Sequence, residues 1–298
     1  MFSCFNVLMK VLILGAKGLL GEALQKIFED HETIVYDREE LDVTDFTKLR
    51  LEITRLQPEV IISCVAWNDV DSAEAEEGRE NSGGLNRARF VNCDVPRELA
   101  ERSRKLGIIF VTYSTDHVFD GENPAGYRED DQPNPVNAYG RSKYCGEQAV
   151  QAVGGKSYII RTSRLYGHKP RSPAAKLNFV LRMIELSKAN KELSSVHEEP
   201  GVFTYVKDLA ETTMKLILEK YPYGIYHLTN SGAVTWYECA REIFRYLNIE
   251  IKLKPAGRRD FPRPARTPKH SILQNTKFPP LRNWKDALHD FLTELDLK

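Results

Sequence analysis

The stretch of residues 10–21 constrains the fold more than any other part of the chain. It starts with a short, partly β-branched apolar run, residues 11–14, which is typical of a strand buried on both faces. Three glycines follow at three-residue spacing: Gly15, Gly18 and Gly21. We expect the first to permit a sharp turn, the second a close approach of a ligand, and the third tight packing of a helix on the strand. The free amides at that helix start favour a pyrophosphate, although the glycines alone are equally compatible with a plain strand–turn–helix.

Strand-like and helix-like segments alternate through the first half of the chain. The further predicted strands are 33–36, 60–65, 108–113 and 157–161. Predicted helices begin at Gly21, cover 44–56, start near 94–96 with a proline in the first turn, and follow Tyr139. This alternation predicts an α/β fold with a doubly wound parallel sheet of the Rossmann type. Ligands of such sheets bind beyond the carboxyl ends of the strands.

The chain divides into three predicted parts. Residues 1–8 form an N-terminal extension, and 9–164 form a dinucleotide-binding Rossmann domain to which 203–230 returns. Residues 165–298 form mainly a smaller C-terminal substrate-binding lobe that is rich in proline. The polar, glycine-rich stretch 78–84 is predicted to be a surface loop.

Composition excludes several classes of protein. With 42 basic and 42 acidic residues in 298, no global field favours nucleic acid or an anionic membrane. No apolar run reaches the roughly 20 residues that span a bilayer, and the first nine residues lack the features of a signal peptide. Five scattered cysteines without Cys-x-x-Cys spacing predict a reducing, cytoplasmic setting and no zinc site. Met9 precedes the first strand, so the sequence leaves open whether Met1 or Met9 is the start.

Tyr139 and Lys143 are spaced four residues apart, which places both side chains on one face of a helix. A free phenol titrates near pH 10, and a nearby cation lowers its pKa. The pair can therefore donate a proton to the alkoxide formed when a ketone is reduced. The alternative is a surface tyrosine beside a solvated lysine.

Other polar residues follow the ends of predicted strands. Ser114 and Thr115 come directly after one strand, where a hydroxyl can hold a substrate carbonyl, or can simply cap a helix. Asp37 ends another strand and can accept hydrogen bonds from an adenosine ribose, whereas Arg38 can bind a 2′-phosphate. This leaves NADPH and NADH both open. Asp42 and Val43, slightly later, can reach the adenine or form a solvated turn.

With these residues in view, the chain from about Met9 onwards resembles the dTDP-4-dehydrorhamnose reductases, a family of the extended short-chain dehydrogenase/reductase superfamily. The matching segments are 15–21, 66–74, 114–121, 127–129, 133–143, 161–163, 208–210, 226–228 and 263–266. The resemblance implies a catalytic trio of Thr115, Tyr139 and Lys143. It implies cofactor contacts at Gly15, Lys17, Gly18, Leu20, Gly21, Val65, Ala66 and Trp67. Substrate contacts are expected at Asn68, Val70, His117 and Arg164.

Several positions depart from the family pattern. His117 stands where the family usually has tyrosine, and Arg164 stands where a tryptophan usually stacks on the nucleotide base. A guanidinium can also stack on a base plane. Phe203 replaces a proline, and about eight residues are inserted between Glu74 and Asn92. The catalytic trio is thus intact while part of the substrate pocket is altered, so the resemblance leaves the substrate open.

Two further features have plain alternatives. His117 is a candidate substrate contact, but a packed histidine or a catalytic base is also compatible with its position. The adjacent acids Glu198 and Glu199 are typical of a solvated loop, and no ligand spacing points to a metal. We expect none.

The resemblance implies an enzyme that uses NADPH or NADH to reduce the C4 ketone of dTDP-4-dehydro-L-rhamnose to dTDP-L-rhamnose. We expect a monomer or homodimer with a dTDP-linked sugar as partner, and neither nucleic acid nor membrane. Two alternatives remain: a reductase or epimerase of another nucleotide sugar, or a non-catalytic cofactor-binding protein like the regulatory subunit of methionine adenosyltransferase.

Overall fold

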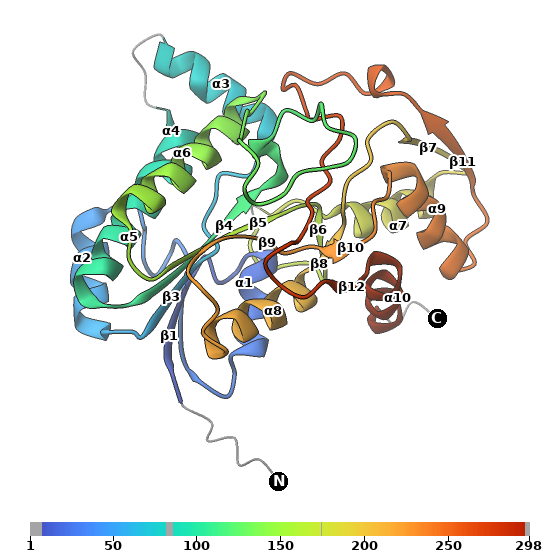
Figure 1. Ribbon diagram of the computed structural model, residues 1–298. Coiled ribbons are helices and arrows are strands. Elements are labelled where there is room, and N and C mark those ends of the chain that lie inside the picture. The colour runs from blue at the N-terminus through green and yellow to red at the C-terminus, as the bar shows by residue number, and fades with distance from the viewer. Residues whose placement is uncertain (1–7, 82–85, 174, 296–298) are drawn as a thin grey trace.

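The computed structural model describes residues 8–81, 86–173 and 175–295. At its centre lies a parallel sheet of six strands in the order β2-β1-β3-β4-β5-β9 (Figure 1). The strands are β1 (Lys10–Leu14), β2 (Glu32–Tyr36), β3 (Val60–Ser63), β4 (Ile109–Thr115), β5 (Ser157–Thr162) and β9 (Gly224–His227). The strand order reverses beside β1, which creates a crevice at the carboxyl ends of β1 and β3. The predicted doubly wound parallel sheet is confirmed.

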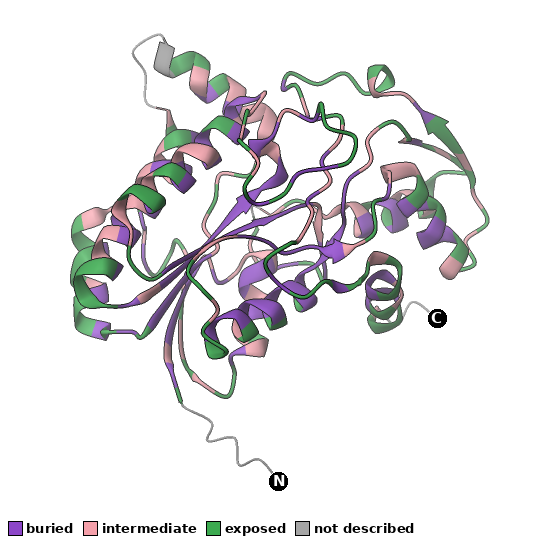
Figure 2. Cartoon of the chain, viewed as in Figure 1, coloured by how far each residue is buried: buried purple, intermediate pink, exposed green. Residues whose placement is uncertain are grey.

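Helices cover both faces of this sheet (Figures 1 and 2). One face carries α2 (Phe46–Leu56), α5 (Val95–Leu106) and α6 (Ala138–Val153), and the other carries α1 (Leu19–Ile27) and α8 (Val206–Leu218). Alternate residues of β1 enter opposite cores: Val11 and Ile13 on the α1 side, Leu12 and Leu14 on the α2 side. Both faces are therefore apolar, which explains the unbroken hydrophobic run.

The rest of the C-terminal part packs beside the sheet (Figure 1). Its helices are α7 (Phe179–Ala189), α9 (Trp236–Tyr246) and α10 (Trp284–Glu294). Its strands form three parallel pairs: β7 (Glu192–Val196) with β11 (Lys252–Ala256), β6 (Leu165–Tyr166) with β8 (Thr204–Tyr205), and β10 (Asn230–Ser231) with β12 (Leu281–Asn283). These pairs form small sheets outside the central one, so this part presents loops and side chains to the strand ends.

Local predictions differ from the structure at two places. Gly78 was expected in a loop, yet it lies in α3 (Val70–Asn81), which precedes the short α4 (Arg87–Arg89); residues 82–84 of that expected loop lie outside the described residues. Gly78 has an ordinary helical backbone, so its glycine did not signal a turn. The strand predicted for 60–65 ends at Ser63, and the chain continues without regular structure to residue 69.

Cys93 and Cys145 form a disulfide, which the expectation of a reducing setting did not anticipate. Cys93 lies in a π-helical turn (Phe90–Asp94) and Cys145 lies on α6. Scattered spacing did not signal the bond, because the two cysteines are 52 residues apart and meet only through the packing of these two segments. Among the described residues Cys64 and Cys239 are free.

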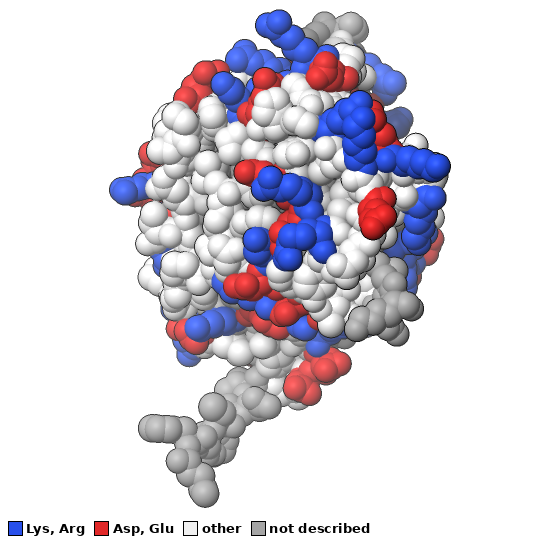
Figure 3. Space-filling model, turned by 90° about the vertical axis from the view of Figure 1, so that its right-hand side faces the viewer, with Lys and Arg blue, Asp and Glu red and all other residues white. Residues whose placement is uncertain are grey.

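Basic and acidic side chains intermingle on the face that Figure 3 shows, in keeping with the net charge of zero. Many charged side chains of the described residues form ion pairs at the surface, such as Lys10 with Glu32 and Lys252 with Glu192. Within the described part of the chain, every helix is too short or too polar to cross a membrane.

Candidate active site

A cavity of about 1410 Å³ lies at the carboxyl ends of the central strands. Its lining runs from the glycine turn after β1, past the ends of β3 and β4, to residues of the C-terminal part. Pockets for a single small ligand usually measure roughly 300–1,000 Å³. The cavity therefore has room for two ligands placed end to end.

The glycine turn forms one end of this cavity. Gly15 has a left-handed backbone (φ +78°), and its amide and that of Ala16 both donate to the carbonyl of Tyr36. A Cβ on Gly21 would lie 2.9 Å from the Cα of Ala16 and closer still to the Gly15 carbonyl oxygen. Gly18, the N-cap of α1, provides no side chain to cap the helix, so the first amides of α1 are available to an anion. Close packing of α1 on the turn and the free amides at its start together form a cradle that fits the pyrophosphate of a dinucleotide.

Asp37 fastens the glycine turn to the end of β2. One carboxylate oxygen accepts from the Lys17 amide at 2.8 Å, and the other accepts from the Arg38 amide at 2.8 Å. Each oxygen keeps a lone pair for a ribose hydroxyl. Asp37 and the exposed Arg38 both line the cavity, as do Asp42 and Val43.

Lys17 is the one predicted cofactor residue that does not line the cavity. Its ammonium pairs with Glu39 and Glu40, which raises the pKa of the lysine. The Lys17 side chain is held by these two carboxylates outside the cavity lining. Its backbone amide supports the turn by donating to Asp37. The expected contact of Lys17 with the cofactor stays a prediction, and the structure shows a supporting role for its backbone amide.

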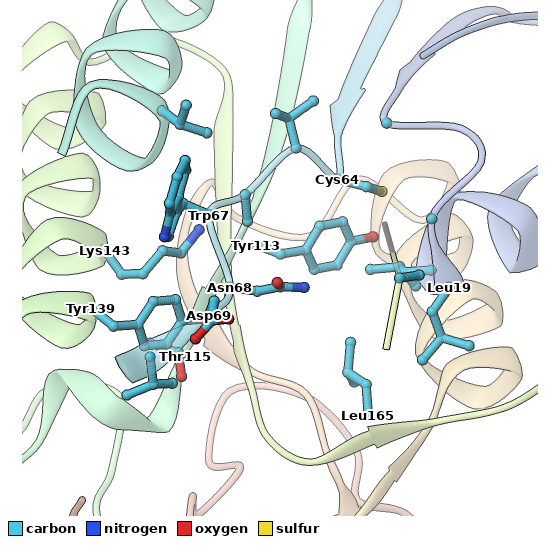
Figure 4. Close-up of a pocket in the computed structure, with 18 of the residues that line it drawn as sticks. Leu19, Cys64, Trp67, Asn68, Asp69, Tyr113, Thr115, Tyr139, Lys143 and Leu165 are labelled. Carbon is cyan, nitrogen blue, oxygen red and sulfur yellow. The ribbon is translucent and has the colours of Figure 1, made fainter. Parts of the chain in front are cut away.

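Thr115, Tyr139 and Lys143 converge in the middle of the cavity (Figure 4). Thr115 ends β4, whereas Tyr139 and Lys143 lie one turn apart near the start of α6. The hydroxyl of Thr115 lies close enough to the phenol of Tyr139 to influence its pKa. Asn137 caps α6 by accepting the Gly140 amide at 2.7 Å, so the helix begins one residue before the tyrosine.

Burial controls the acidity of both α6 side chains. It raises the pKa of Tyr139 to about 12, with Thr115 opposing and Asp116 reinforcing the shift. It also lowers the pKa of Lys143 to about 8, against the attraction of Glu147. The expectation of a lowered pKa for Tyr139 is therefore wrong, because desolvation outweighs any stabilisation of the phenolate. The phenol stays protonated at neutral pH, as a proton donor must.

Asp116 is a site residue that the sequence reasoning did not single out. It is buried, it lines the cavity, and its carboxylate accepts from the hydroxyls of Thr115 at 3.0 Å and Ser163 at 2.7 Å. These bonds join the end of β4 to the segment after β5 and fix the threonine. Its place in the Ser-Thr-Asp sequence was the available signal.

The β3–α3 connection lines the cavity with every residue predicted there: Val65, Ala66, Trp67, Asn68 and Val70. Asn92, on the π-helical turn, holds this connection by bonding the amide and carbonyl of Trp67 at 2.9 and 3.0 Å. The side-chain nitrogen of Asn92 also donates to the hydroxyl of Ser142 on α6 at 2.9 Å. The cofactor-lining segment and the helix of Tyr139 are thus joined through one side chain.

Residues of the C-terminal part close the other end of the cavity. The guanidinium of Arg164 lies over the Trp236 ring at 4.2 Å and donates to the carbonyls of Val234 and Glu199. Arg164 has a left-handed backbone (φ 44°), and burial lowers its pKa to about 10. No carboxylate of the described chain forms an ion pair with it. An unpaired, half-buried cation in a cavity favours an anionic ligand.

Glu199 lines this end of the cavity, which corrects its assignment to a solvated loop. Its carboxylate accepts from Trp236 Nε1 at 3.1 Å and from Thr267 at 3.2 Å, and pairs with Arg258 at 2.9 Å. Trp236 had no sequence signal, because α9 reaches the cavity only through the packing of the C-terminal part. No group of three potential ligands for a metal occurs among residues 8–81, 86–173 and 175–295.

Comparison with known proteins gives consistent matches along the whole chain. The family described as RmlD substrate binding domain matches residues 9–297. A dTDP-4-dehydrorhamnose reductase of Streptomyces griseus is 34% identical over 290 residues, which cover 93% of this chain and 91% of that protein. A dTDP-4-keto-6-deoxy-D-glucose reductase of Streptomyces niveus is 32% identical, covering 93% and 94%. The crystal structure of a dTDP-4-dehydrorhamnose reductase of Bacillus anthracis in complex with NADP superimposes with a TM-score of 0.88 at 36% identity, covering 97% and 100%.

Proposed function

The chain belongs to the RmlD substrate binding domain family, and from this membership we propose that it is an NADPH- or NADH-dependent reductase of a dTDP-linked 4-keto-6-deoxy sugar. The substrate that we propose is dTDP-4-dehydro-L-rhamnose, after the names of relatives, and its product is dTDP-L-rhamnose. The observation that carries the proposal is the meeting of Thr115, Tyr139 and Lys143 beside a cradle for a pyrophosphate.

The chain's residues suit a carbonyl reduction. When bound, the reduced nicotinamide supplies a hydride to the ketone carbon. Tyr139, protonated at neutral pH, donates its phenolic proton to the ketone oxygen as negative charge develops there. Thr115 lies beside the phenol, where its hydroxyl oxygen can hold the ketone and the phenol in line, and Asp116 fixes Thr115. Lys143 supplies positive charge one helical turn away, which favours the tyrosinate left after the proton transfer.

Asp37 and Arg38 bear on the choice between NADPH and NADH. Asp37 is already engaged with two backbone amides, whereas the exposed guanidinium of Arg38 borders the cavity. A free cation there suits a 2′-phosphate. We therefore propose NADPH as the preferred cofactor, in line with the NADP bound to the relative from Bacillus anthracis.

The anionic half of the substrate has a matching end of the cavity. Arg164 lacks an ion-pair partner in the described chain and stacks on Trp236, so it suits either the diphosphate or the plane of the base. Arg164 stands where the family usually has tryptophan, and this difference motivates a second candidate substrate. It is dTDP-4-keto-6-deoxy-D-glucose, which the relative from Streptomyces niveus reduces according to its name.

We also propose a cytoplasmic location and a monomeric or homodimeric state. We base the location on the cofactor and the nucleotide sugar, which the cytoplasm provides. A disulfide such as Cys93–Cys145 is rare in that compartment. Titration of thiols in protein isolated without reductant tests this point. If the disulfide persists, the unfolded protein should show two reactive thiols in addition to that of Cys4. Four in addition to Cys4 would indicate a reduced protein.

A panel of nucleotide-linked keto sugars tests the function. We expect oxidation of NADPH that depends on a dTDP-linked 4-keto-6-deoxy sugar. Faster turnover of a sugar linked to another nucleotide would displace the proposed substrate. Cofactor binding without turnover of any sugar, together with copurification of a transferase, would instead favour a regulatory subunit.

A further inference from the structure

His117 lies where the cofactor end and the substrate end of the cavity meet. Its ring lines the cavity and stands nearly perpendicular to that of Tyr139, with 5.5 Å between the ring centroids. It directly follows Thr115 and Asp116 in the chain, and its backbone amide donates to the Thr115 hydroxyl at 3.2 Å. A polar group of its ring is therefore placed beside the reacting atoms.

The hydrogen bonds of Asn137 determine which ring nitrogen of His117 carries the proton. The Gly140 amide can only donate, so the atom of Asn137 that it contacts at 2.7 Å is the oxygen. The Arg266 carbonyl can only accept, so the atom that it contacts at 2.7 Å is the amide nitrogen. That same nitrogen lies 3.0 Å from Nδ1 of His117. Two backbone groups thus fix the amide orientation, and the amide donates to Nδ1.

A nitrogen that accepts a hydrogen bond holds a lone pair, so in the neutral ring the proton resides on Nε2. Burial lowers the pKa of His117, which keeps the ring neutral near pH 7. Nε2 has no hydrogen-bond partner among the described residues, and it is not one of their fully buried polar atoms. An Nε2–H donor therefore remains available to a ligand in the cavity.

We propose that His117 is a neutral hydrogen-bond donor to an oxygen of the sugar next to the reacting carbon, and that Asn137 positions it by fixing this tautomer. The proposal rests on the proposed function for the identity of the ligand. It assigns His117 to substrate specificity and excludes the role of general base, because the nitrogen facing the cavity has no lone pair to accept a proton. Asn137 acts through His117 and does not itself line the cavity.

The tautomer can be measured without any turnover. In protein labelled with ¹⁵N, two-bond correlations of the ring protons distinguish a protonated from an unprotonated ring nitrogen. The His117 signals are identified by their loss in His117→Gln, with His168→Gln, at an exposed histidine, as the matched control. We expect a bare Nδ1 and a protonated Nε2. A proton on Nδ1, with Nε2 bare, would overturn the assignment.

Asn137→Asp tests the positioning role. A carboxylate accepts from Nδ1–H, so this variant should move a proton onto Nδ1 while the remaining oxygen still caps α6. A merely structural role of Asn137 would leave the tautomer unchanged in any variant that folds, and that result would contradict the positioning role.

Kinetics then test the contact with the sugar. Glutamine reproduces a donor near the position of Nε2, whereas phenylalanine keeps only the ring. We expect His117→Phe to raise KM for the keto sugar by about tenfold, the loss of one hydrogen bond, and His117→Gln to restore most of it. An unchanged KM in His117→Phe would overturn the donor role. If the wild type turns over no keto sugar, the proposed function fails, while the ¹⁵N measurement still decides the tautomer.

Discussion

The two ends of the cavity are built in different ways. The end at the glycine turn, which we propose for the cofactor and call the nucleotide end, consists of backbone groups and small residues. Gly15, Gly21 and the start of α1 lie at its centre. The other end, which we propose for the substrate and call the substrate end, consists of long side chains from distant parts of the chain: Arg164, Glu199 and Trp236. At the first end, shape depends on the absence of side chains. At the second, shape depends on hydrogen bonds among them.

This difference determines what can change without loss of the fold. A turn that a Cβ would fill admits no alternative residue at Gly21, whereas a network of side chains can be replaced member by member. Two of the positions that depart from the family pattern, His117 and Arg164, line the cavity outside the glycine turn, in keeping with this contrast. We infer that the nucleotide end fixes the chemistry and the substrate end sets the specificity.

The largest effect is expected where the two ends meet. Tyr139→Phe should lower kcat by at least about a hundredfold, because it removes the proton donor. The Kd of NADPH and the KM of the sugar should change little, since neither end is altered. Steady-state kinetics and fluorescence titration of the cofactor measure both. Turnover near that of the wild type would remove Tyr139 from its role.

Gly21→Ala should damage only the nucleotide end. The added Cβ would meet the Gly15 carbonyl and the Ala16 backbone, so the turn or the helix must shift. We expect a loss of about 1–3 kcal/mol of stability and a rise in the Kd of NADPH of about tenfold or more. Chemical denaturation and cofactor titration measure these quantities. Gly78→Ala, where a Cβ meets no atom within 4 Å, is the control and should preserve both.

Substitutions of two arginines, one at each end of the cavity, test the two ends independently. Arg164→Gln should raise the KM of the keto sugar by about tenfold with little change in the Kd of NADPH, because it removes the cation of the substrate end. Arg38→Gln should do the reverse and weaken NADPH more than NADH. If both variants change both constants equally, the proposed division of the cavity is wrong.

The smallest expected effect is a dependence of cofactor affinity on pH. Burial lowers the pKa of Lys143 to about 8, so its ammonium is charged below that pH and neutral above it. The affinity for NADPH should therefore fall severalfold as the pH rises through about 8. Titrations across this range in the wild type and in Lys143→Met test the assignment. A dependence that persists in the variant would point to another group.

The contrast between the two ends also explains which features the sequence predicted. The turn from Gly15 to Gly21, the strand β1 and the pair of Tyr139 and Lys143 depend on residues close in sequence, so their spacing was informative. Arg164 and His117 were singled out only because they depart from a family pattern.

Other features depend on tertiary packing and had no local signal. Trp236 and Glu199 lie 37 residues apart and meet through one hydrogen bond, and the disulfide joins segments 52 residues apart. The direction of the Tyr139 pKa was mispredicted for the same reason. Burial decides it, and burial follows from the whole fold.

The most direct test of the central claim is the oxidation of NADPH by the wild type, mixed with enzymatically generated dTDP-4-dehydro-L-rhamnose and followed by the cofactor's near-ultraviolet absorbance. The account predicts rapid oxidation that depends on the sugar, is slower with NADH, and is reduced at least about a hundredfold in Tyr139→Phe. Absence of oxidation with this and every other dTDP-linked keto sugar, in protein that binds NADPH, would contradict it.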